Sequence, residues 1–143
     1  MPTREVEAAS WQLISFNSRK AAQHLLVTGC HRSSISRSYY AAYSAVTSAL
    51  VRQGITLGYG GNNPGHAGLP ALVVNNLTLL PPTVRYDLNK ALRRLYAARI
   101  EADYDPAVRI DELAALAMLR DLSFVYALLD VKGSQDDPAN DRH

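Results

Sequence analysis

Hydrophobic side chains recur at steps of three and four residues along most of the chain, which is the spacing of an α-helix that buries one face. The cleanest stripe falls between residues 33 and 54, where it comprises Ile35, Tyr39, Ala42, Tyr43, Val46, Ala49 and Leu50. The alternation typical of a strand is nearly absent, and its longest run, around residues 71–74, is short. The pattern therefore predicts an all-α protein built as an antiparallel bundle of four to five helices.

Capping residues and helix breakers divide this pattern into separate elements. We expect helices over about residues 3–28, 33–54, 69–79, 83–102 and 111–131. Thr3 is placed to cap the first helix, whose first turn carries Glu5 and Glu7. Ser33 or Ser34 is placed to cap the second. The last helix is apolar nearly all round, so we expect it at the centre of the bundle or at a subunit contact.

One internal segment cannot sustain regular structure. Residues 58–65 are rich in glycine and asparagine and form the long loop expected between the second and third helices. At the other end of the chain, residues 133–143 are a polar tail without a packing signal. We therefore expect a single helical domain over residues 1–132, followed by this tail.

Composition excludes several classes of protein. The chain has 143 residues, of which 48% are hydrophobic and 20% charged, a balance typical of one globular domain. Its single cysteine, Cys30, excludes an internal disulfide framework and every multi-cysteine metal module. His24 and His31 lie on either side of Cys30 without a fourth ligand, so we predict no metal and no cofactor. No apolar run of about 18 residues and no signal-like N-terminus occur, so we expect a cytoplasmic protein without membrane contact.

The small net charge of +2 conceals an uneven distribution. Residues 1–98 carry ten Lys or Arg against three Asp or Glu, whereas residues 99–143 carry five against ten. One face of the fourth predicted helix carries Arg85, Lys90, Arg93 and Arg94. These residues are candidates to bind an anionic partner such as RNA. The same pattern is also typical of a solvent-exposed helix face in a fold that mixes the two sets of charges.

Three segments of the chain are motifs that point to one protein family. Residues 37–43 read Arg-Ser-Tyr-Tyr-Ala-Ala-Tyr, residues 64–68 read Pro-Gly-His-Ala-Gly, and residues 95–105 read Leu-Tyr-x-x-Arg-x-x-Ala-Asp-Tyr-Asp. Together they resemble the HEPN superfamily of prokaryotic helical domains. The first is similar to an Arg-x-Tyr-Tyr-Ala-x-aromatic segment of that family, the second to a histidine-containing turn before its third helix, and the third to the end of its fourth helix. The three segments keep a consistent order across roughly residues 10–130, and this order makes the resemblance specific.

The resemblance implies a bundle of four or five helices that usually forms a homodimer. It also implies a toxin–antitoxin or defence setting, in which such proteins are often paired with a nucleotidyltransferase. Many members are metal-independent RNA-cleaving toxins, and their signature is an arginine followed by a histidine four to six residues later, near the position of Arg99. The family-motif positions predict a polar centre comprising Arg37, Tyr39, Tyr40, Arg99, Asp103, Tyr104 and Asp105.

The catalytic signature is missing from its expected place. After Arg99, residues 103–105 read Asp-Tyr-Asp, and no histidine occurs in the window. An aspartate there would repel a phosphate unless its pKa were strongly raised, whereas an imidazole titrates near neutral pH. Arg19 and His24 do have the signature spacing, but they lie in the first helix, and one such match is expected by chance.

The aromatic and histidine candidates each have a structural alternative. Tyr39 and Tyr43 lie on the apolar stripe, so we expect them in the core. Tyr40 points elsewhere and is the better candidate to stack on a base. His66 follows the glycine-rich loop, where its side chain could reach a substrate or simply hydrogen-bond to the backbone.

Three functions remain open from the sequence. The first is a dimeric binding or regulatory module that acts with a partner and has a possible RNA contact. The second is an atypical metal-independent ribonuclease, in which His66 is the acid or base and Arg37 or Arg99 stabilises the phosphate. The third is a purely structural dimerisation domain. In that case we expect Arg37 to pair with Asp103 or Asp105 and to tie the second helix to the fourth.

Overall fold

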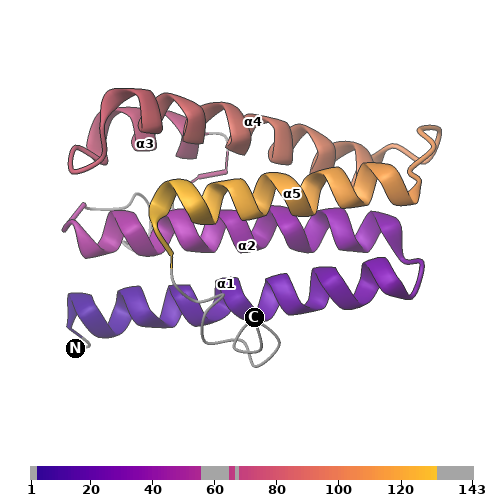
Figure 1. The fold of residues 1–143 in the computed structure, drawn as a ribbon, viewed down its shortest axis with the longest axis horizontal. Helices are drawn as coiled ribbons and strands as arrows, with labels where there is room; N and C mark the ends of the chain where they lie inside the picture. The colour runs from indigo at the N-terminus through magenta and orange to yellow at the C-terminus, as the bar shows by residue number, and fades with distance from the viewer. Residues whose placement is uncertain (1–2, 56–64, 67, 132–143) are drawn as a thin grey trace.

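The computed structural model describes residues 3–55, 65–66 and 68–131, and it places five helices in them (Figure 1). They are α1 (Arg4–Val27), α2 (His31–Arg52), α3 (Leu69–Asn76), α4 (Pro82–Tyr104) and α5 (Glu112–Leu129). No strand occurs in the described residues, so the predicted all-α bundle is confirmed. The predicted loop, apart from Gly65, and the predicted tail lie outside the described residues.

The first two helices begin in different ways. Thr3 caps α1 as predicted, because its side chain accepts a backbone N–H of the first turn at 3.2 Å. In contrast, α2 begins at His31, and its N-cap Cys30 makes no side-chain hydrogen bond to the first turn of the helix. The predicted cap by Ser33 or Ser34 is therefore wrong. Ser34 is fully buried inside the helix, where its hydroxyl donates to a carbonyl of α1.

The ends of α3 and α4 also differ from the prediction. α3 ends at Asn76, whose side-chain amide donates to the carbonyl of Leu72 at 3.0 Å and so competes with continuation of the helix. α4 continues to Tyr104, two residues past its predicted end. Asp103 and Tyr104, which belong to the family motif, consequently lie on the last turn of α4.

The centre of the bundle is α2, not α5 as one predicted placement had it. Figure 1 shows α2 running between α1 on one side and α3 with α4 on the other, with α5 packed against it. Most of the residues of α2 are buried. α5 buries only one face, and its opposite face leaves Leu113 and Phe124 exposed. Serine and alanine make α2 look polar in sequence, although their small side chains suit a buried position.

Serine hydroxyls fix the register of α1 against α2. Each of these contacts joins a buried serine to a carbonyl of the other helix at 2.6 to 2.8 Å: Ser15 to Ala41, Ser34 to Ala22, and Ser48 to Ala8. Successive steps of seven residues along one helix match steps of seven residues back along the other, which is an antiparallel heptad register. The hydroxyls are satisfied in the interior, so burying them carries little penalty.

Two further contacts hold the outer helices in place. Tyr126 of α5 lies 2.7 Å from Oγ of Ser15, and because Ser15 gives its hydrogen to α2, the tyrosine hydroxyl is the donor. Asn89 of α4 donates to the carbonyl of Pro70 at 3.1 Å, which fixes the start of α3. His66 lies only three residues before α3, so this contact also restrains the position of His66. None of the helices in the described ranges is long and apolar enough to cross a membrane.

Candidate functional site

Aromatic rings from α2 surround the imidazole of His66. The centroid of the His66 ring lies 4.6 Å from that of Tyr43, 5.6 Å from that of Tyr39 and 5.8 Å from that of Tyr40. The hydroxyl oxygen of Tyr39 lies 2.6 Å from Nδ1 of His66. Tyr39 and Tyr43 are buried, as the apolar stripe predicted. The two tyrosines that the apolar stripe places in the core therefore also pack against the ring of His66.

Arg99 of α4 approaches the same rings. Its Nη2 donates to the hydroxyl of Tyr40 at 2.9 Å, and its guanidinium carbon lies 5.4 Å from the ring centroid of Tyr40 and 5.4 Å from that of Tyr104. Its Nε lies 2.9 Å from Oδ2 of Asp103, an ion pair in which the N–H does not point at the oxygen in hydrogen-bond geometry. Ser36 donates to the same carboxylate oxygen at 3.2 Å. We call Tyr39, Tyr40, His66, Arg99 and Tyr104 the Arg99 cluster.

The surroundings keep the imidazole and the phenols uncharged at neutral pH. Burial lowers the pKa of His66, and the positive charge of Arg99 lowers it further. Burial raises the pKa of Tyr39, and burial together with the neighbouring Tyr40 raises that of Tyr43 to about 12. The site therefore combines a neutral imidazole with one permanent cation.

The hydrogen bond between Tyr39 and His66 selects one tautomer of the imidazole. Tyr39 is buried, and among the described residues its hydroxyl has His66 as its hydrogen-bond partner. If the phenol donates to Nδ1, its hydrogen is satisfied and the ring proton of His66 sits on Nε2. The opposite arrangement leaves a buried phenol hydrogen without an acceptor, which is costly. In the favoured tautomer Nε2 is a hydrogen-bond donor, suited to a phosphate or hydroxyl oxygen.

An arginine that sequence reasoning missed holds the end of α4. The guanidinium of Arg32 donates to the carbonyls of Glu101, Ala102, Asp105 and Val108. These carbonyls belong to the last turn of α4 and the turn that follows, where a helix lacks internal donors. The sequence did contain a signal for this contact. A positive charge in the first turn of a helix interacts unfavourably with the helix dipole, which indicates that Arg32 has a compensating partner elsewhere.

We call these contacts of Arg32 the Arg32 clamp. Next to it lies an open pocket of about 380 Å³, lined by Arg32, Ala102, Asp103, Tyr104 and Pro106. Tyr104 is 67% exposed. The site thus presents an exposed aromatic ring beside a fixed cation.

Arg37 does not take the place predicted for it. It is exposed, and Asp103 pairs with Arg99 on its own helix, so the expected pairing of Arg37 with Asp103 is wrong. The pairing with Asp105 is also wrong, because no ion pair joins these two described residues, and that carboxylate instead accepts the backbone N–H of Ala107 at 3.1 Å. Arg99 lies four residues from Asp103 on the same helix, so this pair forms without bringing two remote segments together. This explains why Asp103 pairs with Arg99 and not with Arg37.

The basic face of α4 is partly engaged inside the protein. Arg94 forms two hydrogen bonds of 3.1 Å to Asp121 of α5, and Arg85 donates to the carbonyl of Val74. Lys90 lies over the ring of Tyr86 at 4.7 Å. Arg93 is exposed. Of these four basic residues, Lys90 and Arg93 are consequently the better placed for an external anion.

Within the ranges that the structure describes, no group of three His, Cys, Asp or Glu side chains is arranged to hold a metal ion. Among protein families, the model of the HEPN domain matches residues 8–132. No curated protein and no solved structure matches the chain.

Proposed function

Because the chain belongs to the HEPN domain family, we propose that it is a dimeric binding module whose Arg99 cluster contacts RNA. It acts with a protein partner, a nucleotidyltransferase, in a toxin–antitoxin or defence setting. The observation that carries the RNA contact is the position of Arg99 between two tyrosine rings, one of them exposed. Such a ring can stack on a base while the cation meets a phosphate, and the Nε2 donor of His66 adds a contact to oxygen.

Binding of a labelled single-stranded RNA, followed by fluorescence anisotropy at about 50 to 200 mM salt, tests this contact. We expect Arg99→Gln to weaken binding and to reduce the salt dependence. Tyr104→Ala removes a stacking platform, for which losses of about 1–3 kcal/mol per base are typical. Arg109→Gln is the control for the loss of one positive charge, because Arg109 is exposed to solvent and lies in the turn before α5, outside the Arg99 cluster. Equal binding by all four proteins would contradict the proposed site.

The dimer interface that we propose is the outer face of α5. Leu113 and Phe124 are 73% and 42% exposed, and they are eleven residues, or about three turns, apart on one face. Light scattering after size-exclusion chromatography measures the oligomeric state. We expect Phe124→Glu to yield a monomer with unchanged helix content, whereas Val27→Glu, an exposed change on α1, leaves the dimer intact.

The partner is tested by copurification from native cells, with identification of bound protein and nucleic acid. Recovery of a nucleotidyltransferase in stoichiometric amount supports the proposal. Recovery of this protein alone, with neither a protein partner nor RNA, contradicts it.

A metal-independent ribonuclease is the second candidate, and one observation favours it. Although the signature histidine is missing from α4, His66 lies against Tyr40, the same residue that Arg99 binds. A histidine from another segment thus occupies the neighbourhood of the arginine. In this reaction an Nε2 lone pair would take the proton of a 2′-hydroxyl, and the 2′-oxygen would attack phosphorus. The P–O5′ bond would break, and the 5′-oxygen would leave with a proton taken from water. Arg99, rather than the exposed Arg37, would stabilise the charge on the phosphate.

This second candidate needs the tautomer of His66 that the Tyr39 hydroxyl disfavours. RNA incubated with the protein in a metal chelator should then yield 2′,3′-cyclic phosphate ends, and His66→Asn should abolish them. Tyr39→Phe should raise the cleavage rate, because it frees Nδ1 to carry the proton. RNA that remains intact at micromolar protein would exclude this reaction.

A further inference from the structure

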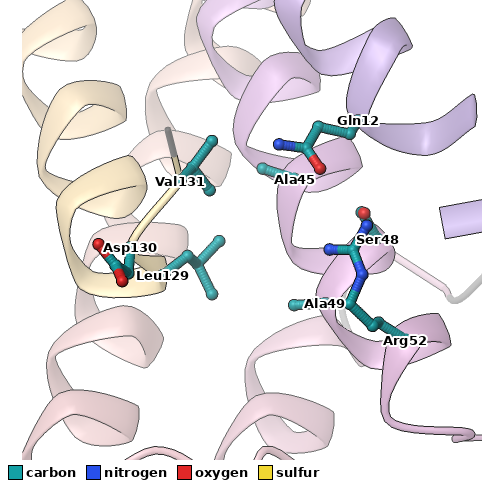
Figure 2. Close-up of a pocket in the computed structure, with 8 residues that line it drawn as sticks. All are labelled: Gln12, Ala45, Ser48, Ala49, Arg52, Leu129, Asp130 and Val131. Atoms are coloured by element: carbon teal, nitrogen blue, oxygen red, sulfur yellow. The ribbon is translucent and has the colours of Figure 1, made fainter. Parts of the chain in front are cut away.

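A second site lies away from the Arg99 cluster, where α2 and α5 end beside α1. It is a pocket of about 260 Å³ (Figure 2). Figure 2 shows Leu129 and Val131, at the end of α5, projecting from one wall. The amide of Gln12 and the guanidinium of Arg52 come from the opposite wall. We call the first the apolar wall, although it also carries Asp130, and the second the polar wall, which also carries Ala45 and Ala49.

The polar wall offers donors to an anion. Ser48 gives its hydrogen to the carbonyl of Ala8, so its oxygen can only accept. Gln12 and Arg52 supply N–H groups. Arg52 faces Glu5, with Nε 3.6 Å from a carboxylate oxygen, and this ion pair is largely exposed to solvent. Among the described residues its guanidinium makes no hydrogen bond. Its guanidinium therefore keeps a donating edge for a second carboxylate.

The apolar wall continues into an adjoining pocket. This second space, of about 300 Å³, shares Ala49, Arg52 and Leu129 with the first. Its remaining lining is Gln53, Leu77, Leu79 and Leu80. Leu79 is 82% exposed. An apolar chain in this space would cover it.

We propose that the two adjoining pockets bind a small monocarboxylate with an apolar chain, its head group on Arg52 and Gln12 and its chain along Leu129 and Leu79. A single negative charge fits better than a phosphate dianion, because Glu5 and Asp130 stand at the same end of the bundle. The two spaces together have the size of ordinary small-molecule sites. This site is independent of the proposed RNA contact.

Amide chemical shifts of the full chain, titrated with hexanoate, hexanol and inorganic phosphate, test the proposal. Hexanoate should shift the amides of residues 45–53 and 129–131, with a Kd of about 1 mM, as expected for a ligand of so few atoms. Hexanol, which lacks the head group, and phosphate, which lacks the chain, should each bind at least about fivefold more weakly. Hexanol binding as tightly as hexanoate would overturn the anion site, and shifts spread over the whole surface would overturn the pocket.

Two variants and one control separate the site from non-specific binding. Arg52→Gln should weaken hexanoate at least about fivefold and leave hexanol unchanged. Ala49→Leu keeps the charge but fills the shared wall, so it should weaken hexanoate and hexanol alike. Arg109→Gln makes the same charge change near the start of α5 and should have no effect. Unchanged hexanoate binding in Arg52→Gln, with the fold verified by circular dichroism, would refute the proposal.

Discussion

The Tyr39 hydroxyl oxygen lies 2.6 Å from Nδ1 of His66, although 27 residues separate them in the chain. This contact joins the central helix α2 to the segment that enters α3. It holds a half-buried imidazole against three tyrosine rings and close to the positive charge of Arg99. The protonation of His66 therefore reports on its burial and on the nearby charge of Arg99.

The pH dependence of stability should carry a contribution from His66. Its pKa in the folded protein lies below the value of about 6.5 expected for the unfolded chain. Between these two pKa values the unfolded chain binds more protons, so stability falls as the pH falls below about 6.5. Urea unfolding at about pH 7.5 and 5.5 should show a smaller drop for His66→Gln than for the natural protein. A histidine that titrates at or above 6.5 by NMR would contradict this expectation.

Arg99 should contribute to stability whether or not it binds RNA. Arg99→Ala leaves Tyr40 and Asp103 without their partner, and we expect a loss of about 2 kcal/mol in the free energy of unfolding. Arg99→Lys keeps the charge but not the planar fork, so it should lose about half as much. The control is Arg93→Ala, an exposed change on the same helix, which should stay within about 0.5 kcal/mol. If only stability falls while RNA binding is kept, the purely structural role is favoured.

Arg32 should hold the last turn of α4. Arg32→Ala removes the donor to the carbonyls of Ala102 and Asp105, among others, and we expect a loss of about 2 kcal/mol. Hydrogen exchange should accelerate first at residues 101–108, because their end of the helix frays. Arg120→Ala, an exposed arginine of α5, serves as the comparison. Exchange that accelerates equally in every helix would show that the clamp is not local.

Ser15 should be the most sensitive of the serines between α1 and α2. Ser15→Ala removes the side-chain donor to the Ala41 carbonyl and the acceptor of the buried Tyr126 hydroxyl, so we expect a loss of about 2 kcal/mol. Ser10→Ala removes only an exposed bond within α1 and should change stability by less than about 0.5 kcal/mol. Thermal unfolding of the two variants makes the comparison. Equal melting temperatures would mean that the buried network contributes nothing.

Gly29 should resist substitution for a backbone reason alone. Its φ of +83° lies in the left-handed region, and a Cβ there would meet no atom within 4 Å. Gly29→Ala should therefore cost about 1 kcal/mol of stability from conformation rather than from a clash. Gly68 has a φ of −85°, so Gly68→Ala should be close to neutral. Chemical denaturation measures the free energy of unfolding of both variants. Both lose the flexibility of glycine in the unfolded chain, so the difference between them reports the backbone strain at residue 29.

The serines of α2 show where reading a sequence by polarity fails. Ser34, Ala41 and Ser48 are spaced by seven residues, as are Ala8, Ser15 and Ala22 on α1. This double series of small residues was a usable signal for close helix packing. Polarity instead suggested a cap at Ser34 and a central role for the more apolar α5. In the structure, the buried serine hydroxyls donate to carbonyls of the facing helix. Such bonds depend on how two helices pack together, so they cannot be seen in the pattern of either helix alone.

The candidate site divides in the same way. Arg99 and Asp103 are four residues apart on one helix, so their pairing follows from the sequence by a local rule. The approach of His66 to Tyr39 follows from no local rule, because it depends on how α3 packs on α4. Arg32 is likewise far in sequence from the carbonyls that it binds.

The sequence by itself determined the helical class, the burial of Tyr39 and Tyr43 on the apolar stripe, and the family. Periodicity and the order of motifs can be read along the chain without knowing how its segments pack. Tertiary structure decided which helix is central, which partner Asp103 takes and that His66 lies against Tyr40 beside Arg99. These outcomes depend on distances between segments remote in the chain. Such distances are set by side-chain volume and by the need to satisfy every buried polar group.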